Sequence, residues 1–237
     1  MMTATTADTI PVAATGRTSG MRRIGCAVAM LLAPWGFVVA NTAYLLAIRD
    51  GGNEDTGADT LALYAAHPGL VHAAVTGGML ACLLIVPAVM GVFPLAPTSR
   101  LTLIGGSLMI AGYICYFGVL NSSIGTLALA LADGPVDAMA QVVEDTQADV
   151  WGLWVFLLFV IGNLIGTLLF AIGLLRSRSV PLWAALAIMS WPPLHVIGLA
   201  FFGNEVPQVI GAVLQALGFA GCAVALLRRG MNTPSDG

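Results

Sequence analysis

The dominant pattern in the chain is a series of long apolar stretches separated by short polar connections. Six stretches contain no Asp, Glu, Lys or Arg: residues 24–48, 69–92, 101–132, 150–175, 180–204 and 206–227. A helix needs about 20 apolar residues to cross the hydrocarbon core of a bilayer. The stretches lack the alternation of barrel strands, and a helix satisfies its own backbone amides in lipid. We therefore predict an all-α fold: a polytopic membrane helical bundle with six transmembrane helices, forming one domain over residues 21–229.

The third stretch is too long for one straight span. Its 32 residues would make a helix of about 48 Å, whereas the hydrocarbon core is about 30 Å thick. Asn121, Ser122 and Ser123, followed by Gly125, are expected to interrupt the helix. The predicted span is therefore residues 101–120.

A short surface helix is predicted after this span. Asp133, Gly134 and Pro135 form a helix-start signal, and apolar and acidic residues then alternate with helical spacing. We expect a helix over residues 135–147 that lies on the outer face of the bundle, as a lid.

Charged residues are confined to the connections and the ends, and the two signs separate. Eight of the nine arginines fall on one side of the predicted topology: Arg17, Arg22, Arg23, Arg100, Arg176, Arg178, Arg228 and Arg229. Ten of the twelve carboxylates fall on the other: Asp50, Glu54, Asp55, Asp59, Asp133, Asp137, Glu144, Asp145, Asp149 and Glu205. Since basic residues accumulate in cytoplasmic loops, we predict a multi-pass membrane protein with both termini on the cytoplasmic side.

Composition supports this class and excludes others. Apolar residues make up 58% of the chain and charged residues 9%, which is incompatible with a water-soluble globule. There is no lysine and the net charge is −3, so no basic face exists for nucleic acid. Residues 1–20 and 230–237 are expected to be flexible tails. The first span is expected to stay uncleaved, because its length exceeds the apolar core of a signal peptide.

Polar residues within the spans are the best indicators of function, because burying them in lipid is costly. In the predicted topology they gather toward the outer leaflet, which predicts a cavity that opens to the periplasm. The candidate ligand-binding residues are Asn41, Tyr44, His72, Tyr116, Asn121, Trp154, Trp191, His195 and Gln215. The structural alternative is that the aromatic residues form an interfacial belt and the amides join neighbouring helices.

The fifth span contains a conspicuous local motif, Ser190-Trp-Pro-Pro-Leu-His195. Two adjacent prolines remove two amide donors and must interrupt the helix, which leaves carbonyl groups near Ile188 and Met189 without their usual partners. The carbonyls and the His195 imidazole would line a cavity, or the interruption would serve packing alone.

A haem held by His72 and His195, or a metal site made of a histidine and Glu205, is a further candidate, although no spacing motif supports either. The four cysteines, Cys26, Cys82, Cys115 and Cys222, lie singly in different spans and are expected to be packing residues. We expect no cofactor.

The second half of the chain resembles a known family. One span ends in Gly-Leu-Leu-Arg-Ser-Arg (173–178), the next opens with Ser-Val-Pro-Leu-Trp (179–183), and the last ends in Leu-Leu-Arg-Arg-Gly (226–230). This order resembles a broad family of bacterial six-helix integral membrane proteins of unknown function, with the likeness mainly in the last three helices. The resemblance implies the fold and a bacterial membrane, and it carries no activity or catalytic residues.

Three functions follow from these patterns. The first is a periplasm-facing intramembrane pocket that binds or passes a lipid, isoprenoid or other small apolar ligand. Such a protein would act as a homo-oligomer or as an accessory subunit of a larger membrane complex. The second is an acid-initiated isoprenoid cyclase, in which Glu205 or Asp149 donates a proton among aromatic side chains. The third is a haem or metal-binding membrane protein.

Overall fold

The computed structural model describes residues 12–198 and 205–231. Within these residues the chain is helical and contains no strand, which confirms the predicted all-α class. Five helical segments are long and apolar enough to cross a membrane: Gly20–Ile48, Pro68–Leu95, Arg100–Ala130, Gly152–Ser177 and Val206–Arg229. Many of their large apolar side chains, such as Leu83 and Ile114, are exposed on the outside of the bundle, as expected of a surface that meets lipid.

The helices follow one another with short connections. In chain order they are α1 (Val12–Ile48), α2 (Gly57–Ala66), α3 (Pro68–Val92), a 3-10 turn (Phe93–Leu95), α4 (Arg100–Ala130), α5 (Val136–Ala148), α6 (Val150–Val160), a π-helical turn (Ile161–Gly166), α7 (Thr167–Ser177), α8 (Leu182–Met189), α9 (Trp191–Ile197) and α10 (Val206–Met231).

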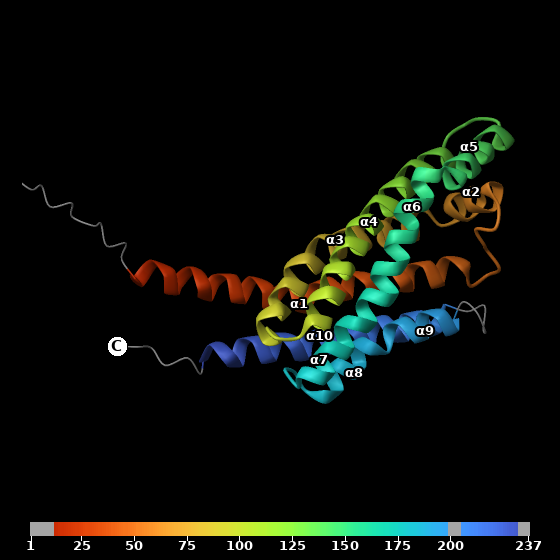
Figure 1. The fold of residues 1–237 in the computed structure, drawn as a ribbon. Helices are drawn as coiled ribbons and strands as arrows, with labels where there is room; N and C mark the ends of the chain where they lie inside the picture. The colour runs from red at the N-terminus through yellow and green to blue at the C-terminus, as the bar shows by residue number, and fades with distance from the viewer. Residues whose placement is uncertain (1–11, 199–204, 232–237) are drawn as a thin grey trace, which may run out of the picture.

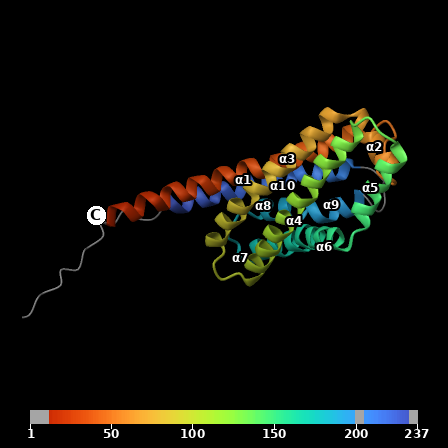
Figure 2. The same ribbon diagram turned by 90° about the horizontal axis from the view of Figure 1, so that it is seen from above.

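The long helices form an elongated bundle. The first helix, α1, packs along α3 and α10, while α4 packs against α3 on one side and against α6 and α7 on the other. Helices α8 and α9 pack on α10. The start of α1 and the end of α10 lie at one end of the bundle, and α2 and α5 lie at the opposite end (Figures 1 and 2).

Glycines set the closest helix contact. A Cβ atom at Gly112 of α4 would lie 2.7 Å from the Cα atom of Gly162 in the π-helical turn. Gly105 of α4 and Gly166 of the π-helical turn form a second close contact, in which a Cβ atom at Gly105 would lie 2.7 Å from the Gly166 carbonyl oxygen. Small residues at such positions allow two helix backbones to approach closely, which is how helices associate in the absence of a hydrophobic driving force.

The predicted break at 121–125 is wrong, because α4 runs without interruption from Arg100 to Ala130. The serines that suggested this interruption form hydrogen bonds with the backbone of the same helix. The hydroxyls of Ser122 and Ser123 donate to the Val119 carbonyl at 2.6 and 3.5 Å, so the helix satisfies them itself. The additional turns of α4 support α2 and α5.

The described helices continue beyond the predicted domain limits of 21 and 229. Helix α1 begins at Val12, and α10 extends to Met231. A helix already nucleated by the apolar span adds further residues at little cost, which explains both extensions. Residues 1–11 and 232–237 lie outside the described residues.

The predicted fifth span is interrupted where its prolines suggested. Helix α8 ends at Met189, α9 begins at Trp191, and Pro192 and Pro193 occupy the first turn of α9, where proline is tolerated because no amide partner is needed. Together they form a described apolar segment, Leu182–Ile197, that is shorter than the five long ones. Residues 199–204, the end of the predicted span, lie outside the described residues.

Two short helices cover one end of the bundle. Helix α5 corresponds to the surface helix predicted over 135–147, whereas α2 was not predicted. Its N-terminus is capped by Thr56, whose side chain accepts from the Asp59 amide. Leu61 of α2 packs against buried residues of α5, and the Gly57 amide donates to Glu144 Oε1 at 3.0 Å. The two helices therefore form one capping unit.

Candidate functional site

A cavity of about 710 Å³ opens between the long helices near the end covered by α2 and α5. This volume lies within the range of small-molecule sites. Most of the wall is apolar. The polar and aromatic side chains that line it are Asn41, Tyr44, Glu54, Tyr64, Tyr116, Ser123, Phe156, Phe159, Asn163, His195, Glu205 and Gln208.

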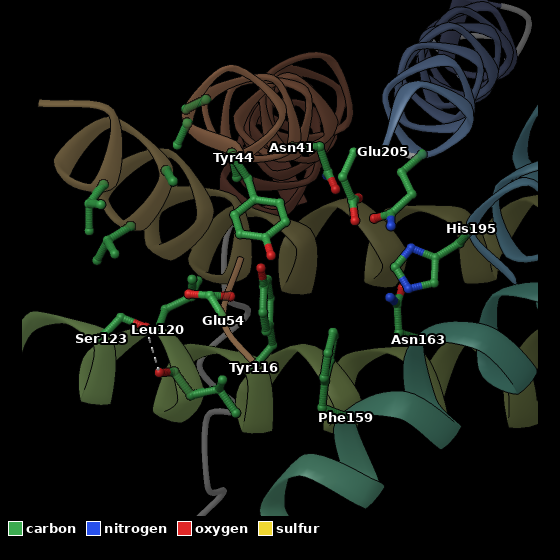
Figure 3. A pocket seen from close by; sticks show the side chains of 18 of the residues that line it. Asn41, Tyr44, Glu54, Tyr116, Leu120, Ser123, Phe159, Asn163, His195 and Glu205 are labelled. Atoms are coloured by element: carbon green, nitrogen blue, oxygen red, sulfur yellow. Dashed lines mark hydrogen bonds between the residues drawn. The ribbon is translucent and has the colours of Figure 1, made fainter. Parts of the chain in front are cut away.

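Side chains from distant parts of the sequence converge on this space. In Figure 3, Tyr44 points from α1 toward Tyr116 of α4, and Glu54 lies beside the two rings. Glu205, His195 and Asn163 occupy the other side of the view. The Tyr116 ring stacks on Phe159 with centroids 4.3 Å apart. Rigid aromatic walls with a few polar groups are typical of sites that bind small molecules.

Asn163 holds one wall of the cavity together. Its Oδ1 atom accepts from the Tyr113 hydroxyl at 2.8 Å and from Trp191 Nε1 at 3.1 Å. One amide thereby joins α4, the π-helical turn and α9, and its side chain is 3% exposed. A π-helical turn adds one residue to the helix and is frequent at functional sites.

His195 presents an unsatisfied atom. Its ring lies tilted against Trp191 at a centroid distance of 5.2 Å, and Gln208 is its hydrogen-bonding neighbour. Its Nδ1 atom is buried and has no hydrogen-bond partner in the part of the chain that the structure describes. Buried polar atoms without partners are rare and call for an explanation.

Two carboxylates, Glu54 and Glu205, also line the cavity. Glu205 is 8% exposed, and its carboxylate has no hydrogen bond or ion pair within residues 12–198 and 205–231. Burial raises the pKa of Glu205, and the negative charge of Glu54 raises it further. Burial also raises the pKa of Tyr64 in α2 to about 12, again with a contribution from Glu54. The Glu54 carboxylate therefore acts on both Glu205 and Tyr64.

Glu205 should make stability depend on pH. Because its pKa is raised in the folded protein, the folded state binds the proton more tightly, and this contribution is present below the ordinary value of 4.5 and lost as the pH rises through the raised value. Glu54 is the charged group that acts on it. Thermal unfolding of purified protein across this pH window should show a falling midpoint in the wild type and a flatter profile in Glu205→Gln. Parallel profiles would contradict the assignment, and Asp137→Asn, an exposed carboxylate, is the control.

The predicted ligand-binding residues divide into two groups. Asn41, Tyr44, Tyr116 and His195 line the cavity, and Trp191 supports it through Asn163 and His195. Gln215 is 1% exposed and lies in the core beside Tyr113 rather than in the wall.

The remaining predicted residues do not line the cavity. His72, Asn121 and Trp154 are exposed on the outside of the bundle. Helical spacing explains the difference, because α3, α4 and α6 each turn another face toward the cavity. Of the two candidate acids, Glu205 lines the cavity, whereas Asp149 is an exposed residue that caps α6 by accepting from the Gly152 amide at 3.1 Å.

The paired histidine site is not formed. His195 lines the cavity and His72 does not. In the part of the chain that the structure describes, no three His, Cys, Asp or Glu side chains come together in a way that could hold a metal ion. His195 and Glu205 share the cavity without a third ligand among those residues.

The sequence analysis missed Asn163, Glu54 and Tyr64. Asn163 is the one amide of its apolar stretch and stands between Gly162 and Gly166, which is a signal that could have indicated it. Glu54 and Tyr64 lie in a connection read only as an acidic loop, and they reach the cavity because α2 folds back over the bundle. Nothing in the local pattern indicates that return.

Comparison of the chain with protein-family models, with curated proteins and with solved structures finds no match.

Proposed function

We propose that this protein is a six-span protein of the bacterial cytoplasmic membrane whose cavity binds or passes a small apolar molecule at the periplasmic side. The α8–α9 segment with the residues that follow it would supply the sixth span. The separation of arginines from carboxylates supports this topology, because cytoplasmic loops are rich in basic residues. In the bundle, the Arg229 guanidinium donates to the Pro94 carbonyl at 3.0 Å. The end of α10 therefore lies beside the connection between α3 and α4.

The observation that carries the binding function is the cavity itself. Its wall is mainly aliphatic and aromatic, with a few convergent polar groups, and such a cavity within an apolar bundle is suited to a lipid, an isoprenoid or a molecule of similar character. The resemblance to bacterial six-helix proteins agrees with the topology. The small residues on the helix surfaces would support self-association or a larger membrane complex.

Filling the cavity should expel the ligand. Ala74 lines it from α3, and Leu83 of the same helix is exposed on the outside. Ala74→Trp should reduce the lipid or other small molecule that remains bound after purification about tenfold, because the added ring occupies the binding space. Native mass spectrometry measures the bound mass. Leu83→Trp should leave it unchanged, and equal retention by both variants would refute the proposal.

An acid-initiated isoprenoid cyclase is the second candidate, because Glu205 is a buried acid in a cavity with aromatic walls. Turnover of a prenyl substrate that Glu205→Gln abolishes, with the substrate still bound, would establish it over simple binding.

A further inference from the structure

The cavity contains acceptors that lack donors. His195 Nδ1 is buried without a hydrogen-bond partner among the described residues. The carboxylate of Glu205, a residue that is 8% exposed, has neither a hydrogen bond nor an ion pair among the described residues. Asn41 contributes in the same direction, because its Nδ2 donates to the Phe37 carbonyl at 2.7 Å and leaves Oδ1 as the acceptor. A ligand that donates several hydrogen bonds would satisfy all three.

The charge of the cavity points to the same ligand. Glu54 and Glu205 are its two carboxylates, and no arginine is among the residues found to line it. Arg49, the basic residue nearest to Glu54 in the sequence, is exposed and forms an ion pair with Asp50 at 3.4 Å. His195 is suited to the neutral form, because an imidazolium would need an acceptor at the unpartnered Nδ1. The carboxylates therefore have no counter-charge of their own.

The aromatic residues complete the argument. Tyr44 and Tyr116 meet beside Glu54, and Phe159 stacks on Tyr116 (Figure 3). Aromatic faces attract cations through the ring quadrupole, most strongly where water is excluded. A carboxylate beside aromatic faces, as Glu54 is here, favours a positive group in the cavity and disfavours a negative one.

We propose that the ligand is a lipophilic amine in its protonated form, whose ammonium group lies between Glu205, His195 and Asn41 and whose apolar body lies along the aromatic and aliphatic wall. The inference rests on the proposed binding function and specifies the substrate class of that cavity. An ammonium has donors for all three acceptors and supplies the counter-charge that the carboxylates lack.

The test uses three probes of nearly the same shape: 4-phenylbutylamine, 4-phenylbutanol and 4-phenylbutyrate. Binding to the full-length protein in lipid nanodiscs is measured by isothermal titration calorimetry at neutral pH, with empty nanodiscs as the reference. The amine should bind about tenfold more tightly than the alcohol, because hydrogen bonds to charged groups are the stronger ones. The carboxylate should bind most weakly.

Isosteric variants assign the preference to the cavity. In Glu205→Gln the affinity for the amine should fall to that for the alcohol, with the alcohol unaffected, and Glu54→Gln should have a smaller effect in the same direction. Asp137→Asn removes an exposed carboxylate of the same end and should keep the full preference. If the alcohol binds wild type as tightly as the amine does, the amine proposal fails and the binding function stands. If no probe binds and Ala74→Trp retains the co-purified ligand, the binding function itself fails.

Discussion

Gly112→Ala should be strongly destabilising, although it adds a single methyl group. The new Cβ would meet the backbone of Gly162 and Asn163 at 2.7 to 3.0 Å, and a backbone cannot rotate away as a side chain can. Overpacking typically costs about 1–3 kcal/mol, and we expect the upper end of this range. Thermal or denaturant unfolding in detergent measures the loss.

Gly125→Ala is the matched control in the same helix. A Cβ atom at Gly125 meets nothing within 4 Å, and replacing a glycine inside a helix by alanine gains about 0.5–1 kcal/mol. The two variants should therefore change stability in opposite directions. The same sign for both would show that the α4–π-turn contact is looser than described.

Asn163→Leu is the second change with a large expected effect. It preserves the approximate volume of the side chain and removes the oxygen that both Tyr113 and Trp191 use. Each orphaned buried donor costs about 1–3 kcal/mol, so the total for the two should be about 2–6 kcal/mol. The affinity of the cavity for its ligand should fall as well, because Asn163 holds Trp191 and Trp191 positions His195.

A double-mutant cycle separates the bond from general disruption. In Tyr113→Phe the phenolic donor is absent, so the additional cost of Asn163→Leu should shrink by the share that Tyr113 contributed. Purely additive costs for the two changes would show that the Tyr113–Asn163 bond does not contribute to stability.

The sequence predicted the long helices well, because their apolar stretches are uninterrupted. It also predicted the interruption near Ser190, where proline chemistry is local. It failed at residues 121–125, where the serine hydroxyls are satisfied within the helix, a choice that the local pattern leaves open. The five long apolar segments agree with the membrane class.

The site was predicted in part. Asn41, Tyr44, Tyr116 and His195 were named because polar groups are rare in such segments, and they line the cavity. Glu205 also lines it, and it was named as a candidate acid of an outer connection. His72, Asn121 and Trp154 were misplaced because depth along a helix says nothing about which face a residue occupies. Glu54 reaches the site through the tertiary return of α2, which no local pattern encodes.

The widened turn at 161–166 shifts the helical phase of everything beyond it. One additional residue rotates the following segment by about 100° relative to a continuous α-helix, so α6 and α7 present faces that no single helical wheel can describe. Deleting one residue from this turn would leave α7 in place only if Phe156 and Phe159 swung away from the cavity. Single-residue gaps at this point in related sequences would therefore mark proteins with a differently shaped cavity.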